Sequence, residues 1–188
     1  MSSAPKPGPK LVAKSGPKSA PRRAAGTVAA SAPAVREDRG HYLVRRAPFT
    51  GSVLVDSGPL IALFNAGDHW HAPVLEWLRG NPAARLLGTW PVATEVCALL
   101  ASRLHNDAAL DFLRWAQRGG IAFDVAVEGT LTEVLRLSER FASLPFDLAD
   151  ASIAEAAARL RLRHVLSIDA DFDVYRDRAG KPLVNLLR

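Results

Sequence analysis

The feature that most constrains the fold is a pair of short apolar runs, each of which ends in an aspartate. Residues 52–55 precede Asp56, and residues 164–168 precede Asp169. Such runs are typical of buried strands in a parallel sheet, where ligand sites lie just beyond the carboxyl ends of the strands. Several carboxylates in one crevice repel each other and are costly to desolvate unless a cation is present. The pattern therefore predicts a divalent-metal site.

The net charge is divided unevenly along the chain. The 188 residues contain 24 Lys and Arg against 19 Asp and Glu. Ten of the basic residues but only two of the acidic ones fall in residues 1–50, so that segment carries a net charge of +8 and the rest −3. With 48% apolar residues, the chain has material for one domain and a tail rather than two large domains.

Two compositional features bear on the setting of the protein. No stretch approaches the roughly 18 consecutive apolar residues of a membrane span, so we expect no membrane association. The single cysteine, Cys97, excludes an intramolecular disulfide framework and fits a reducing compartment. We therefore expect a cytoplasmic protein and interpret Cys97, in an apolar helical run, as a small buried core thiol.

Residues 1–50 form a basic extension rich in Ala, Pro and Lys, and residues 51–188 form the expected folded domain. Because residues 1–46 contain almost no large apolar side chains, we expect them to be disordered. The simplest interpretation is a solvated extension, or a start site assigned too far upstream. An electrostatic arm for nucleic acid or an acidic partner and a transit-like segment remain as alternatives.

Beyond residue 50, short apolar runs alternate with helical patterns, as is typical of parallel βα units. The prediction is an α/β fold with a short parallel sheet of four or five strands. The predicted strands are residues 52–55, 85–88, 121–125, 163–168 and 183–187. The predicted helices are residues 59–65, 71–78, 91–104, 107–117, 129–141 and 147–160.

The first two candidate site residues are Asp56 and Glu95. Asp56 closes a strand, where it would also cap the next helix; the neighbouring Ser57 would orient it, hold a water, or itself be the cap. Glu95 lies on an otherwise apolar helical stretch, and none of its neighbours three or four residues away offers a counter-charge. Since Glu is rarely buried unless paired, we interpret Glu95 as a site residue.

The remaining acidic candidates lie in two clusters. Asp147 is well placed as a helix N-cap, and Asp150 suits the first turn of the same helix, where acids favour the helix dipole. From the residues alone, Asp150 is equally well explained as structural or as functional. Asp169, Asp171 and Asp173 follow the later strand; without the expected glycine and glutamate they make a poor calcium loop. Asp169 is the best metal candidate of these, Asp171 the second.

Other chemistries find little support. His69 and His71 are better explained by a surface loop than by a ligand pair, and the sequence contains no phosphate-binding glycine loop and no nucleophile elbow. The four tryptophans are interpreted as core or interface anchors rather than base-stacking platforms. A phosphatase with an aspartyl nucleophile expects a second acid at position 58, which is Gly. A receiver-like domain expects a lysine near the last strand, and Lys181 is poorly placed.

Four blocks together resemble the PIN-domain family, specifically the VapC-type toxin ribonucleases. They are VLVDSGPLIALF at 53–64, PVATEVCALL at 91–100, FASLPFDLADASIAEAAARL at 141–160 and SIDADFDVYR at 167–176. The family's acidic positions fall on Asp56, Glu95, Asp150 and Asp169, which favours the functional interpretation of Asp150. Ser57 and Ser167 stand where Thr is usual, and both keep a hydroxyl.

The resemblance implies a three-layer α/β/α nuclease domain that cleaves RNA with a divalent metal, Mg²⁺ or Mn²⁺, which suits carboxylate oxygens. It also implies the toxin role in a type II toxin–antitoxin pair, with a cognate antitoxin partner and a homodimer. The alternatives are a solitary PIN nuclease in RNA processing and a non-catalytic module that binds RNA or antitoxin. Basic residues must hold the RNA backbone; the candidates are Arg85, Arg103, Arg176 and Arg178.

Overall fold

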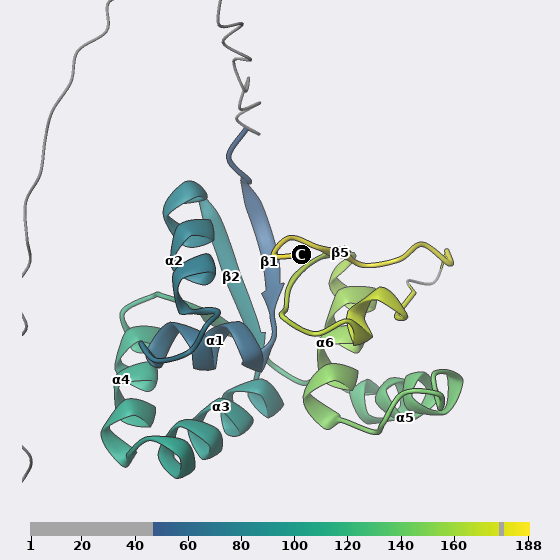
Figure 1. Ribbon diagram of the computed structural model, residues 1–188. Coiled ribbons are helices and arrows are strands. Elements are labelled where there is room, and N and C mark those ends of the chain that lie inside the picture. Colours follow the sequence, from purple (N-terminus) through teal and green to yellow (C-terminus); the bar gives the residue numbers. More distant parts are fainter. Residues whose placement is uncertain (1–46, 177–178) are drawn as a thin grey trace, which may run out of the picture. The chain divides into compact units, whose positions relative to one another are not determined.

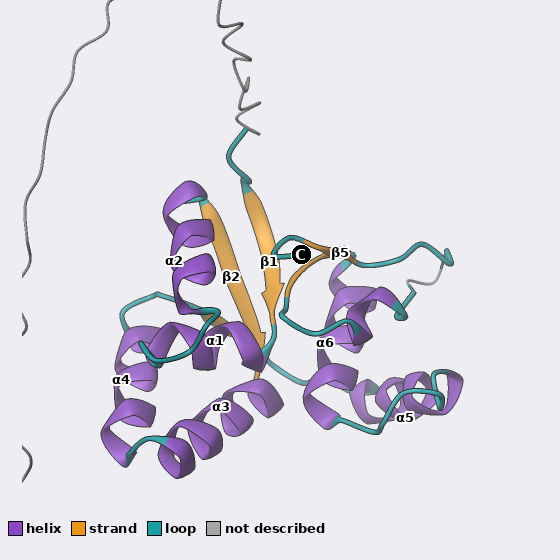
Figure 2. Cartoon of the chain, viewed as in Figure 1, coloured by secondary structure: helices purple, strands orange, loops and turns teal. Residues whose placement is uncertain are grey.

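The strand β1 (Gly51–Val55) is buried, as its apolar residues predict, and forms the middle of the sheet. The computed structural model describes residues 47–176 and 179–188; the predicted disorder of residues 1–46 and the candidate Arg178 lie outside them. Among the described residues, β1 lies between β2 (Ala84–Thr89) and β4 (His164–Leu166), with β3 (Ala122–Asp124) and β5 (Val184–Asn185) at the edges. All strand pairs are parallel (Figures 1 and 2).

The helices cover both faces of this sheet. On one side lie α1 (Ser57–Phe64), α2 (His71–Gly80), α3 (Trp90–Arg103) and α4 (Asn106–Gln117), and on the other side lie α5 (Thr130–Arg140) and α6 (Leu148–Leu160), as Figure 1 shows. The three-layer α/β/α arrangement confirms the predicted fold class. The strand order β3-β2-β1-β4-β5 differs from the order of receiver domains and argues against that alternative. It also places a switch point between β1 and β4, where open sheets bind ligands.

The core explains why these segments fold as they do. Val53, Leu54 and Val55 of β1 are almost completely buried, as are Val165 and Leu166 of β4. On α6, residues 151–157 are all buried, because small side chains at most of these positions let the helix approach the sheet closely. No helix of the described part is long and apolar enough to span a membrane.

Several element boundaries differ from the predictions. Three predicted strands, 121–125, 163–168 and 183–187, are shorter because their partners offer few paired residues; β4, for example, meets β1 only at Leu54 and Val55. A short 3₁₀ turn, η1 (Asp171–Asp173), was not predicted. Cys97 is half-buried against the core rather than buried. Phe49, expected in the extension, packs against the rings of Trp77 and His164.

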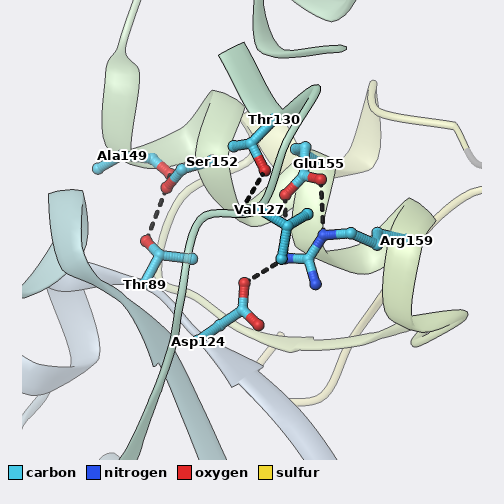
Figure 3. A network of polar contacts seen from close by, with 8 residues as sticks. All are labelled: Thr89, Asp124, Val127, Thr130, Ala149, Ser152, Glu155 and Arg159. Carbon is cyan, nitrogen blue, oxygen red and sulfur yellow. Dashed lines mark hydrogen bonds and ion pairs between the residues drawn. The ribbon is translucent and has the colours of Figure 1, made fainter. Parts of the chain in front are cut away.

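A buried charge network attaches α6 to the end of β3 (Figure 3). Glu155 on α6 is only 4% exposed, and the Arg159 guanidinium, one turn later, donates hydrogen bonds to its carboxylate at 2.8 and 3.2 Å. Arg159 also donates to Asp124, the last residue of β3. Arg159 is the shared partner of Glu155 on the helix and of Asp124 on the strand. The network therefore holds the helix in one position relative to the sheet.

Two hydroxyl contacts extend this attachment (Figure 3). The Thr89 and Ser152 hydroxyl oxygens lie 2.6 Å apart, and the Ser152 hydroxyl donates to the Ala149 carbonyl at 2.7 Å. Thr89 ends β2 and is the N-cap of α3. In the loop between β3 and α5, the Val127 amide donates to the Thr130 hydroxyl at 3.1 Å. The second turn of α6 is therefore tied to the start of α3, and the later turns are tied to β3 through Arg159.

We predict that Arg159→Ala lowers the free energy of unfolding by about 3–5 kcal/mol, because it leaves Glu155 buried without its partner. The control is Arg114→Ala, which removes an arginine paired with Asp111 on the surface of α4; exposed pairs contribute about 1 kcal/mol or less. Chemical denaturation of the two variants measures the difference. Equal losses for both variants would contradict the role of Arg159.

Candidate functional site

Asp56 is fixed by three hydrogen bonds at the point where β1 ends. Its amide donates to the Leu166 carbonyl of β4 at 3.0 Å. One carboxylate oxygen accepts from the Ser57 amide at 2.6 Å, and the other accepts from the Ser167 hydroxyl at 2.8 Å. Asp56 is therefore the N-cap of α1, as predicted for its structural role, and Ser57 is the first helical residue rather than the cap. The Asp56 side chain is held rigidly, with only 5% of the residue exposed.

Ser167 connects the end of β1 to the end of β4. Its side chain is fully buried, and its hydroxyl oxygen accepts a hydrogen bond from the Asp169 amide at 2.9 Å while its proton goes to Asp56. Asp169 itself is exposed, and its carboxylate accepts from the Asp171 amide at 3.2 Å. The polypeptide after β4 thus turns around one serine and presents Asp169 beside Asp56.

Gly58, in the first turn of α1, lets the helix and the segment after β4 approach each other closely. A Cβ atom at this position would lie 2.6 Å from Cγ1 of Ile168 and 3.8 Å from an Asp56 carboxylate oxygen. The first distance is far shorter than van der Waals contact, so a side chain here would push the segment after β4 away. The absence of a second acid at position 58 thus has a packing reason.

Asp147 and Asp150 enter the site from the opposite face of the sheet. Asp147 is the N-cap of α6, as predicted, and accepts from the amides of Ala149 at 2.7 Å and of Asp150 at 3.2 Å. Asp150 lies in the first turn of α6 and is half-buried. Glu95 is also half-buried, on α3. The acids therefore come from β1, α3, α6 and the segment after β4.

Burial and mutual repulsion raise the free energy of the ionised acids. Burial raises the pKa of Asp56 to about 6; the hydrogen bonds from Ser167 and Ser57 oppose this rise, and the charges of Glu95 and Asp169 add to it. The pKa of Asp150 is shifted further.

Burial raises the pKa of Asp150 to about 8, and the charges of Asp56, Asp147, Asp169 and Asp171 contribute to the rise. The pKa of Asp171 is also raised, by burial and by Asp169. All four predicted site residues thus interact electrostatically with one another, directly or through a shared neighbour. A bound cation would relieve both the burial and the repulsion.

The acids do not form a ready-made cage. Within residues 47–176 and 179–188, no three carboxylate, histidine or cysteine side chains are grouped closely enough to hold a metal ion by themselves. Mg²⁺ is commonly bound through one or two carboxylates, with water and substrate phosphate completing its octahedron. The all-oxygen donor set and the raised pKa values of Asp56 and Asp150 fit such an ion.

Tyr175 is a residue of this region that the sequence interpretation missed. It is 5% exposed and packs against the rings of Phe141 and Phe172. Burial, together with the charges of Asp150 and the neighbouring acids, raises its pKa to about 12. Its only signal in the sequence is its position two residues after the Asp169–Asp173 cluster.

The secondary candidates lie elsewhere or have structural roles. The His71 ring Nδ1 lies 2.8 Å from the Ala62 carbonyl, and His69 is largely exposed, so the two do not form a ligand pair. Arg85 occupies the second position of β2, near the end of the sheet opposite to Asp56. Arg103 ends α3, two turns beyond Glu95. Arg176 follows η1 and donates to the backbone carbonyls of that segment.

The raised pKa values predict that the metal-free protein loses stability as the pH rises. A carboxyl whose folded pKa exceeds its unfolded value of about 4 holds its proton more tightly when folded, so its contribution is present below about pH 4 and is lost through the folded pKa. For Asp150 that loss extends to about pH 8. We expect the melting temperature in chelator to fall between pH 5 and 8.

The variant Asp150→Asn is expected to flatten this dependence, most clearly above about pH 7, where Asp56 has largely titrated. The matched control is Glu76→Gln, at an exposed position of α2. Thermal unfolding followed by circular dichroism across the pH range measures the effect. A parental slope in Asp150→Asn would contradict it.

Comparison with known proteins bears on the family and the fold. Residues 53–177 match the PIN domain family. Ribonuclease VapC26 of Mycobacterium tuberculosis is 29% identical over 119 residues, covering 62% of this chain and 86% of that protein. Among solved structures, Mycobacterium tuberculosis VapC20, described as a Sarcin-Ricin loop cleaving toxin, superposes with a TM-score of 0.62 at 20% identity.

The VapBC2 complex from Rickettsia felis, bound to a DNA fragment from its promoter, superposes with a TM-score of 0.53 at 12% identity. Each of these two structures covers 71% of this chain, and this chain covers 98% of each. At such identities the superpositions concern the fold alone. Because the family match spans well over half of the 188 residues, the chain belongs to the PIN domain family.

Proposed function

We propose that this protein is a metal-dependent endoribonuclease and the toxin of a type II toxin–antitoxin pair. The observation that carries the proposal is the Asp56 carboxylate, buried at the switch point of the sheet and exposed to the charges of Glu95 and Asp169. Keeping these acids ionised costs free energy unless they bind a cation. The similarity to Ribonuclease VapC26 supports RNA as the substrate, and the fold shared with the VapBC2 complex supports an antitoxin partner.

The proposed ion is Mg²⁺ or Mn²⁺, held by Asp56 and Asp150 directly or through water, with Glu95 and Asp169 completing the site. When bound, the ion supplies an activated water at neutral pH and steadies charge on the scissile phosphate. Two serines and two further acids support these residues.

Each supporting residue acts through an observed contact. Ser167 holds Asp56 in one orientation through its 2.8 Å hydrogen bond, and the Ser57 amide holds the other oxygen. Asp147 caps the helix that carries Asp150, and Asp171 positions Asp169 through its amide. In addition, we propose that Glu95 or Asp169 orients the attacking water by accepting a hydrogen bond from it.

The proposed organisation is a nuclease domain over residues 51–188 preceded by a basic extension, acting in the cytoplasm as a homodimer. Two alternatives stay open: a solitary PIN nuclease in RNA processing, and a non-catalytic module that binds RNA or antitoxin. The presence of all four acids argues against the second alternative. A small DNA-binding protein encoded immediately upstream would favour the toxin–antitoxin pair over the solitary nuclease.

We predict that Asp56→Asn reduces RNA cleavage at least about 100-fold, since a catalytic ion contributes several kcal/mol to the transition state. Cleavage of labelled single-stranded RNA with Mg²⁺ or Mn²⁺ supplied measures the rate, and circular dichroism checks the fold. The control Asp107→Asn changes an exposed acid on α4 and should cleave normally. Cleavage at the parental rate by a folded Asp56→Asn protein would overturn the assignment.

Metal binding should also be visible without any substrate. At pH 8, Mn²⁺ at a hundredfold excess over its Kd is expected to raise the melting temperature by about 5–10 °C, because it binds the folded state alone. Chelator should reverse the shift. Asp150→Asn should show a smaller shift, whereas Glu76→Gln should show the full one. An equal shift in all three proteins would place the ion elsewhere.

A further inference from the structure

Trp90 is the exposed tryptophan of this domain. It is 55% exposed, whereas Trp70, Trp77 and Trp115 are partly buried, the last two against the core. The residue is the first of α3, directly after the N-cap Thr89 that ends β2. An indole left in water at the carboxyl end of a central strand forgoes much of the free energy that its burial would give. This cost suggests a role in binding.

The indole is supported from behind. The rings of Trp90 and Phe123 lie 5.1 Å apart at 32°, so Phe123 covers part of the indole surface and holds it in place. Phe123 in turn pairs in register with Gly88 of β2, where a Cβ atom would lie 3.1 Å from its ring. Gly88 therefore makes room for the ring that supports Trp90. The platform is preorganised, so a ligand would pay little to order it.

Trp90 borders a hollow whose lining includes Glu95, one of the four candidate site residues. The hollow has a volume of about 560 Å³, and Trp90, Pro91 and Leu148 form its apolar part. Glu95 and Asp147 also line it. Glu95 acts electrostatically on Asp56, and Asp147 acts on Asp150. A molecule on Trp90 is therefore adjacent to the proposed reaction centre.

We propose that Trp90 is a stacking platform for an unpaired RNA base next to the scissile phosphate, an inference that rests on the proposed ribonuclease function. RNA-binding proteins read single-stranded segments by stacking splayed bases on aromatic side chains. The two carboxylates repel a phosphate but accept hydrogen bonds from the amino groups of bases. The hollow consequently takes the base and leaves the backbone outside. Trp90 then acts in substrate binding and not in the chemical step.

The test compares Trp90→Leu and Trp90→Phe with the parent on a short single-stranded RNA that the parent cleaves at a mapped bond. Trp90→Leu should raise KM by about 5-fold to 100-fold, the range expected for one lost base stack, with kcat nearly unchanged. Trp90→Phe keeps a ring and should retain most of the affinity. The control Leu135→Ala alters an equally exposed apolar residue on α5 and should leave KM unchanged.

Abasic RNA locates the base. One abasic nucleotide beside the cleaved bond should raise KM for the parent but add little in Trp90→Leu, because both changes remove the same stack. An unchanged KM in Trp90→Leu, or fully additive effects, would overturn the proposal. It would also be overturned if Trp90→Leu lost a protein partner while handling RNA normally, since the hollow would then be a protein-binding surface.

A binding assay separates this proposal from the ribonuclease function. Fluorescence anisotropy measures how a labelled random-sequence RNA binds to Asp56→Asn, with and without Trp90→Leu, independently of cleavage. If the parent does not cleave RNA but Trp90→Leu weakens binding at least about fivefold, the nuclease proposal fails and the platform stands. Equal RNA affinity with and without Trp90→Leu would overturn the platform, whether or not the parent cleaves.

Discussion

The arrangement of the site depends on one hydrogen bond, from the Ser167 hydroxyl to the Asp56 carboxylate across the ends of β1 and β4. A carboxylate buried this deeply is costly, and the hydrogen bonds from Ser167 and the Ser57 amide offset part of that cost. Because Ser167 also accepts from the Asp169 amide, the same contact positions a second acid. Two separate strand ends thereby become one polar surface.

The rest of the fold positions the acids that β1 and β4 do not carry. On one face of the sheet, α3 begins immediately after β2 and carries Glu95 in its second turn. On the other face, α6 carries Asp150 in its first turn, and the Glu155–Arg159–Asp124 network holds that helix against β3. Contacts outside the site thus hold these mutually repelling acids in position. Buried charge is present both in the network and in the site. In the network Arg159 pairs with the acids, whereas the site contains acids alone.

Local patterns in the sequence were enough to predict the order of the strands and helices along the chain and to single out the acidic candidates. Asp56 and Asp169 were recognisable because buried apolar runs end at them, and Asp147 because a polar residue precedes a long helix. Asp150 needed the family resemblance, since an acid in a first helical turn has a sufficient structural explanation. The stacking of Trp90 on Phe123 was not predictable, because it depends on the register between β2 and β3. Ser167 was a secondary candidate from the family resemblance, but its hydrogen bond to Asp56, 111 residues away, was not predictable.

The central claim is that these acids gather to bind a divalent ion. Crystals of the protein grown with Mn²⁺, measured at a wavelength where manganese scatters anomalously, test it most directly. The account predicts an anomalous peak within coordination distance of Asp56, roughly 2 Å from its oxygen or one water further away, with Asp150 close by. An anomalous map without a peak among these four acids, at Mn²⁺ concentrations that support RNA cleavage, would contradict it.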